Sequence, residues 1–219
     1  MNKSLYSLML SDDVVREIDR LALRSGVSRS ALVNRVLAEY AGVRTPEMQI
    51  DSIFRQVEQL LEGAGEIVPF FTRGQQSMTM KSSLEYKYRP TVKYAVQLYK
   101  GVDSLGRFGE LTINFRTQSR ELLDRLAAFF GYWKLLEDQY LAPRFPAGAS
   151  DYALQDGRFV RTLALPQGSS FTNEEIGDAI TGYVRTFDML LKAWLAESLD
   201  YQSLEQNYVK LLQQAPVMI

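Results

Sequence analysis

The sequence contains neither cysteine nor histidine in its 219 residues. Disulfide bonds, thiol nucleophiles and the usual cysteine–histidine zinc sites are therefore excluded. Catalysis by a serine–histidine–aspartate or cysteine–histidine arrangement is excluded for the same reason. An enzyme built from this chain would have to use carboxylates, lysine, tyrosine or an oxygen-ligated metal ion. No motif in the sequence indicates such a catalytic site, and none indicates a cofactor or metal, so we expect a protein that is not an enzyme.

The sequence also lacks any apolar run close to the roughly 18 residues of a membrane-spanning helix. The apolar stretch from Leu5 to Leu10 is too short for the core of a signal peptide, and it alternates with polar residues. Hydrophobic residues make up 46% of the chain and charged residues 23%, which is the balance of a folded globular protein. We therefore expect a cytoplasmic protein that does not bind a membrane.

The net charge is small, −1, but it is unevenly distributed. Residues 1–45 carry 7 basic and 5 acidic side chains (+2), and residues 73–125 carry 10 and 5 (+5). Residues 46–72 carry 1 and 5, and residues 126–219 carry 7 and 11, so both are −4. The basic block places four cations on predicted outward positions: Lys81, Lys87, Lys93 and Arg116. Two interpretations fit them, a second nucleic-acid surface or, more commonly, a face that keeps a sheet soluble.

The first 42 residues show the pattern of a strand followed by two helices. Residues 4–10 alternate, which predicts a strand. One of its faces carries Tyr6, Leu8 and Leu10, and the other carries Leu5, Ser7 and Met9. A helix is predicted from Ser11 or Asp12 to Gly26, and a second helix from Ser28 to Gly42.

A unit of about 40 residues cannot bury an adequate core alone. The single strand also has no partner within this segment. Both problems are solved if two chains pair their strands antiparallel and interlock their helices. The sequence therefore predicts an obligate dimer with Tyr6, Leu8 and Leu10 in its core.

The rest of the chain predicts an α+β domain with an antiparallel sheet and helices. Thr45-Pro46 reads as a linker, which divides the chain into a module of residues 1–44 and a domain of residues 48–219. The predicted helices of this domain are about 50–62, about 119–141 and from Asn173 onward, and the predicted strands are 77–88, 91–99, 110–117 and 158–165. The last apolar stripe fits one long helix or two, with Ser198 or Asp200 capping the second.

The N-terminal unit resembles the ribbon-helix-helix family, the Arc/MetJ/CopG class. The resemblance rests on the alternating span Lys3 to Ser11 and on the turn Gly-Val-Ser-Arg-Ser-Ala-Leu at residues 26–32. It implies a homodimer, or a higher even oligomer, whose paired strands enter the major groove of double-stranded DNA. The residues it would place against the bases are Lys3, Leu5, Ser7 and Met9. The residues it would place against a phosphate, at the start of the second helix, are Ser28, Arg29 and Ser30.

One feature departs from the family pattern: Leu5 and Met9 are apolar, and only Ser7 is a conventional reader of base edges. Two main hypotheses follow. The first is a transcriptional regulator whose C-terminal domain senses a small ligand or another protein. The alternative is a dimeric adaptor or antitoxin-like module that binds protein rather than DNA and uses the ribbon-helix-helix unit only for dimerisation.

Overall fold

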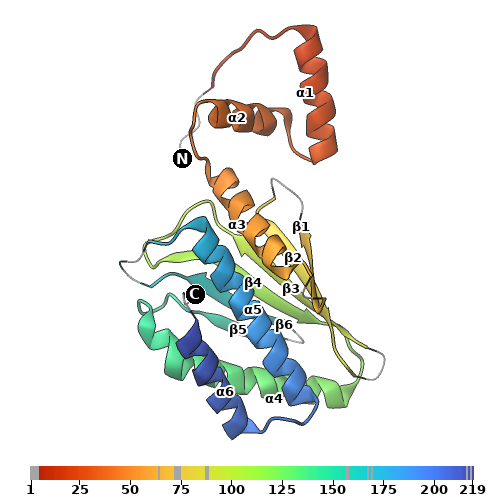
Figure 1. Cartoon of the computed structure of the whole chain (residues 1–219), viewed down its shortest axis with the longest axis vertical. Coiled ribbons are helices and arrows are strands. Elements are labelled where there is room, and N and C mark those ends of the chain that lie inside the picture. Colours follow the sequence, from red (N-terminus) through yellow and green to blue (C-terminus); the bar gives the residue numbers. More distant parts are fainter. Residues whose placement is uncertain are drawn as a thin grey trace.

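The computed structural model describes residues 5–63, 65–71, 75–86, 89–155, 158–166, 168, 170–215, 217 and 219. The predicted base-facing Lys3 and the predicted outward Lys87 lie outside these ranges. Figure 1 shows two helices, α1 and α2, set apart from a larger body in which helices cover a sheet. Within the described ranges, no helix is both long and apolar enough to cross a membrane.

Both helices of the N-terminal unit are confirmed. Helix α1 spans Asp12–Ser25 and ends at Gly26, whose φ of 63° lies in the left-handed region that glycine favours. Helix α2 spans Arg29–Tyr40 and is capped by Ser28. Residues 5–10 form no strand within the single chain. A strand there requires a partner that one chain does not supply.

The interpretation of Thr45-Pro46 as a linker is wrong. These residues begin helix α3, Pro46–Leu61, which therefore starts about four residues before the predicted helix. The Thr45 hydroxyl accepts a hydrogen bond from the Met48 amide at 3.3 Å, and Pro46 occupies the first helical turn, where its missing N–H costs nothing. The connection between α2 and α3 is thus confined to residues 41–44.

The sheet is antiparallel throughout and has the strand order β1-β2-β3-β4-β6-β5. Its strands are β1 Ile67–Phe71, β2 Ser77–Ser83, β3 Thr91–Leu98, β4 Arg107–Phe115, β5 Tyr152–Gln155 and β6 Arg158–Ala164. The edge strands β1 and β5 were not predicted, because both are short and β1 contains Pro69. Strand β2 ends five residues before the predicted end at residue 88.

The helices pack on one face of the sheet (Figure 1). They are α3, α4 Arg120–Leu136, α5 Asn173–Leu195 and α6 Tyr201–Gln214, and α4 continues into a π-helical turn, Glu137–Leu141, and a 3-10 turn, Ala142–Arg144. The alternation of β3 is confirmed, since Tyr94 and Val96 are buried whereas Lys93 is exposed. The last predicted apolar stripe, from Asn173 onward, forms two helices, α5 and α6. Asp200 caps α6, because its carboxylate accepts a hydrogen bond from the Ser203 amide at 2.7 Å.

Candidate nucleic-acid interface

The predicted ribbon is exposed on both faces in one chain. On the face expected to meet DNA, Leu5 and Met9 have exposed fractions of 99% and 102%, and Ser7 is exposed as well. On the opposite face, Leu8 and Leu10 keep 50% and 46% of their surface exposed. Tyr6, on the same face, is 82% exposed, so a single chain buries neither face of the ribbon.

The helices of the module also leave much of their apolar surface uncovered. Only three hydrophobic side chains of α1 and α2 are buried: Ala22, Leu32 and Ala38. The larger apolar residues that stay exposed in the two helices are Val14, Val15, Leu23, Val36, Leu37 and Tyr40. So many exposed apolar side chains on two short helices favour an interaction site on this module.

The structure brings Ser28, Arg29 and Ser30 together at the start of α2. The Ser28 hydroxyl accepts a hydrogen bond from the Ala31 amide at 3.2 Å and lies 3.3 Å from the Ser30 hydroxyl. Within the described ranges, the amides of Arg29 and Ser30 have no hydrogen-bond partner. Two N–H groups at the positive end of a helix are thereby available to an anion.

The Arg29 side chain is engaged by a residue that sequence reasoning missed. Its guanidinium forms an ion pair with the carboxylate of Asp19 in α1. The two groups are not aligned well enough to form a hydrogen bond. The Arg29 side chain remains 70% exposed. Asp19 therefore competes with any phosphate for this guanidinium. No periodicity in the sequence indicates the pair, because it joins two helices across a turn.

Two further arginines of α1 are also paired with acids. Arg16 contacts Asp13, and Arg20 donates to Glu17 at 2.5 and 3.0 Å. The hydrogen bond from Arg20 lowers the pKa of Glu17, so this carboxylate stays ionised. Arg16 and Arg20 are thus each paired with an acid of their own helix, and the open amides at the start of α2 become the more favourable anion contact.

Comparison with known families identifies the N-terminal segment. Residues 7–42 match the family described as ribbon-helix-helix protein, CopG family. These residues are a ribbon-helix-helix module. The match covers α1, the turn and α2 and ends at Gly42, before the C-terminal body begins. No curated protein and no solved structure matches the chain.

The basic block of the sequence is only partly gathered by the fold. Lys81 and Lys93 are directly paired across β2 and β3 on the face of the sheet opposite the helices. The Lys81 ammonium lies 4.8 Å from the centre of the Phe70 ring. Arg116 lies just beyond the end of β4, two residues after Asn114, which pairs with Lys93. In the register of the sheet, Lys93 thus lies between Lys81 and the end of β4 that precedes Arg116, and Lys87 lies outside the described residues.

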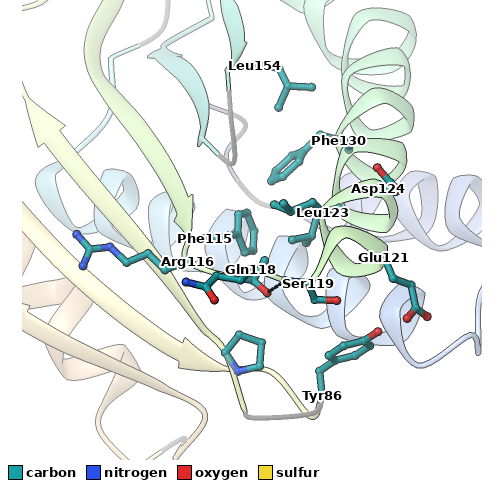
Figure 2. A pocket seen from close by; sticks show the side chains of 14 residues that line it. Tyr86, Phe115, Arg116, Gln118, Ser119, Glu121, Leu123, Asp124, Phe130 and Leu154 are labelled. Carbon is teal, nitrogen blue, oxygen red and sulfur yellow. Dashed lines mark hydrogen bonds between the residues drawn. The ribbon is translucent and has the colours of Figure 1, made fainter.

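A wide hollow of about 1380 Å³ lies between the end of β4 and the first turns of α4 (Figure 2). Phe115, Phe130 and Leu154 supply apolar wall, and Arg116 and Glu121 are among its charged residues. Figure 2 shows Arg116 and Glu121 on opposite sides, pointing away from each other. These two opposite charges therefore do not converge on one point of the hollow. In the part of the chain that the structure describes, no cluster of three acidic side chains is placed to hold a metal ion.

Proposed function

We propose that this chain is a cytoplasmic, dimeric DNA-binding transcriptional regulator, rather than an enzyme, and that its C-terminal body senses a small ligand or a partner. The observation that carries the proposal is the ribbon-helix-helix module of residues 7–42. Modules of this kind place two paired strands in the major groove. The body, with its antiparallel sheet and the helices packed on it, then offers a surface and an interior that this DNA contact does not use.

The exposed apolar surface of the module supports dimerisation. A second chain would cover Leu8 and Leu10 by pairing its own ribbon with this one, and it would cover Val36 and Tyr40 by interlocking helices. Burial of apolar surface contributes about 25 cal/mol per Å², and the single chain leaves this contribution unrealised. Dimerisation also supplies the hydrogen-bond partners that residues 5–10 lack in one chain.

The module supports DNA contacts that rest mainly on phosphates. Leu5 and Met9 can touch thymine methyl groups but cannot hydrogen-bond to base edges, so Ser7 carries most of the direct readout. Discrimination between bases is then expected to fall below the roughly 1–3 kcal/mol of a good bidentate pair. The free amides of Arg29 and Ser30, together with the exposed Arg29 guanidinium, supply affinity that does not depend on sequence.

Fluorescence anisotropy of the full chain on random and on upstream-region DNA tests the proposal. Binding should fall steeply between about 50 and 200 mM salt, because each neutralised phosphate releases counterions. Arg29→Ala should weaken binding to all sequences about equally, whereas Ser7→Ala should change selectivity more than affinity. Lys210→Ala, an exposed lysine of α6, serves as the control and should leave binding unchanged. Absence of binding to either DNA at low salt would overturn the proposal.

A specific observation favours the alternative function of a protein-binding adaptor or antitoxin-like dimer. The ribbon face that would meet DNA carries two fully exposed apolar side chains, Leu5 and Met9. A protein partner with an apolar groove would cover them at a gain in free energy. If the wild-type chain is dimeric but binds neither DNA, this alternative becomes the better account.

A further inference from the structure

The face of the sheet opposite the helices presents a row of basic side chains. Helices α3, α4, α5 and α6 all pack on the other face (Figure 1). The register joins four residues across β2, β3, β4 and β6, in the order Lys81, Lys93, Asn114 and Arg158, which we call the basic row. Its three cations are exposed, and each is followed along its strand by a buried residue. Neighbouring strands lie about 4.8 Å apart, so the basic row spans about 14 Å of the open face.

The cations of the basic row have no counter-ion. Within the described ranges, none of the three forms an ion pair. Six other cations of the body do have an acidic partner: Lys100, Arg107, Arg125, Lys134, Arg161 and Lys192. Even Arg161, which is completely buried, lies 2.8 Å from a carboxylate oxygen of the equally buried Glu137. Unpaired positive charge is therefore not the rule in this body.

The sheet places two of these cations directly opposite each other. Lys81 and Lys93 are paired across β2 and β3, and like charges in this position destabilise a sheet. The Lys81 ammonium lies 4.8 Å from the centre of the Phe70 ring, which holds the charge in place without neutralising it. Opposite charges at the two positions would keep the sheet equally soluble and would stabilise it. The opposed lysines therefore indicate that an external anion supplies the missing charge.

The acids nearest the basic row lie at the margins of the face. Glu110 of β4 lies about 14 Å along the strand from the row, and it accepts a hydrogen bond from the Thr112 hydroxyl at 3.2 Å. Glu66 precedes β1 and pairs with Lys192 at 3.2 Å. Glu85 lies beyond the end of β2. Among the described residues, none of these acids forms an ion pair with the row, so its three positive charges stay available.

The composition of the open face fits nucleic acid better than protein. The residues on either side of the basic row are mostly small and polar: Thr79, Ala95, Thr112 and Val160 on one side, and Ser83 and Thr91 on the other. Lysine, serine and alanine are depleted in protein–protein interfaces, whereas interfaces with DNA are polar and positively charged. Among the described strand residues, Phe70 is the one aromatic on this face, whereas single strands need several for stacking. The face therefore fits the backbone of a duplex.

We propose that the basic row binds the phosphate backbone of double-stranded DNA, with Lys81, Lys93 and Arg158 as cations and Asn114 as a hydrogen-bond donor. A duplex carries one negative charge per about 1.7 Å of its axis, so about eight phosphates occupy the length of the row. Phosphate contacts carry no sequence information, so this surface adds affinity without base selectivity. It goes beyond the proposed function, in which the module alone contacts DNA.

Fluorescence anisotropy of the full chain on a random duplex tests the proposal. The double variant Lys81→Gln/Lys93→Gln removes two phosphate contacts. The ratio of the affinities at about 50 and 200 mM salt should then fall by about tenfold, because each contact contributes a factor of about three to this ratio. Lys93→Arg keeps the charge and should bind as the wild-type chain does.

The matched control is Lys134→Gln/Lys210→Gln. It also lowers the net charge by two, but its lysines lie on α4 and α6, on the other side of the sheet, so the affinity ratio should stay unchanged. The midpoint of thermal unfolding gives a second measurement. Lys81→Gln should leave this midpoint unchanged or raise it, because it removes the repulsion from Lys93.

The proposal is overturned if Lys81→Gln/Lys93→Gln keeps the wild-type ratio, or if the control variant loses as much of it. A lower unfolding midpoint for Lys81→Gln would also count against it, because the lysine would then serve the stability of the sheet. Tighter binding of single-stranded DNA than of duplex would assign the face to another ligand. So would a loss, in the double variant, of binding to a polyglutamate peptide but not to DNA.

This test is separable from that of the module. If the module makes no phosphate contact, Arg29→Ala has no effect on DNA affinity while Lys81→Gln/Lys93→Gln still weakens it. If the basic row makes none, the effects of the two variants are reversed.

Discussion

The two regions of the chain differ in how much of their apolar surface a single copy buries. The C-terminal body encloses a continuous core in which large side chains such as Phe54, Trp133 and Phe187 have no exposed surface, and it even shields a charged pair. The ribbon-helix-helix module buries only three small or medium apolar side chains and exposes most of the larger ones. The body therefore completes its core within one chain, whereas the exposed apolar surface of the module is what the proposed dimerisation would cover.

The largest expected effect is a loss of stability in the C-terminal body. Glu137→Gln should destabilise the chain by about 3–5 kcal/mol, because it leaves the Arg161 charge buried without its counter-ion. Asp138→Asn is the control, since Asp138 pairs with Lys134 at the surface, where such a pair contributes about 0–1 kcal/mol. Urea unfolding measures both variants. A loss below about 1 kcal/mol for Glu137→Gln would contradict the assignment of a tightly coupled buried pair.

The next effect concerns the module and its need for a partner. Leu8→Asp places a charge in the predicted dimer core, so it should convert the dimer to a monomer at micromolar concentration while the body stays folded. Leu5→Asp places the same charge on the opposite face of the ribbon and should remain dimeric. Sedimentation and circular dichroism distinguish these outcomes. A wild-type chain that sediments as a monomer would refute the dimer.

The connection between the regions should be the first site of proteolysis. Residues 41–44 are exposed, whereas Thr45 is buried and begins α3. Limited trypsin treatment should therefore cut after Arg44 and release a body that begins at Thr45. Arg44→Gln should slow this first cut, as verified by mass spectrometry of the fragments. A first cut at Arg55 within α3 would show that the predicted boundary is misplaced.

The periodicity of the sequence predicts those elements that have one apolar face. Helices α1 and α2 and strand β3 follow from it because capping residues and strict alternation mark them clearly. Strands β1 and β5 were missed because each is an edge strand of four or five residues without a clear alternating pattern. Short edge strands are stabilised mainly by their neighbours, which local sequence does not reveal.

The candidate sites were predictable only in part. The family resemblance identifies Ser28, Arg29 and Ser30, but the Asp19 partner of Arg29 depends on the angle between two helices. Outside these sites, the buried Arg161 did leave a signal, because it lies in phase with the buried Phe159 and Leu163 along β6. A charged residue at an inward strand position requires a buried counter-ion. Its partner, Glu137, continues the stripe of the buried Phe130 and Trp133 along α4, but which acid meets Arg161 depends on how this helix packs on the sheet, which local sequence does not reveal.

The smallest expected effect tests whether an acidic side chain of the module weakens its affinity for DNA. Asp19→Asn releases the Arg29 guanidinium from its ion pair, so DNA affinity should rise by about threefold near 50 mM salt and less at higher salt, where screening weakens both contacts. The salt dependence of binding should steepen by up to about one phosphate contact. Stability should change by less than about 1 kcal/mol, because the Arg29 side chain is largely exposed.

The control for this prediction is Asp13→Asn, which removes the same charge from the same helix but frees Arg16 instead of Arg29. Both variants shift the net charge of the chain by +1, so a general electrostatic attraction would raise the affinity of both equally. A selective gain for Asp19→Asn would locate the phosphate contact at the start of α2, where the free amides of Arg29 and Ser30 lie. Equal gains would show that α1 and α2 attract DNA only through their total charge, and the predicted phosphate site at residues 28–30 would then be wrong.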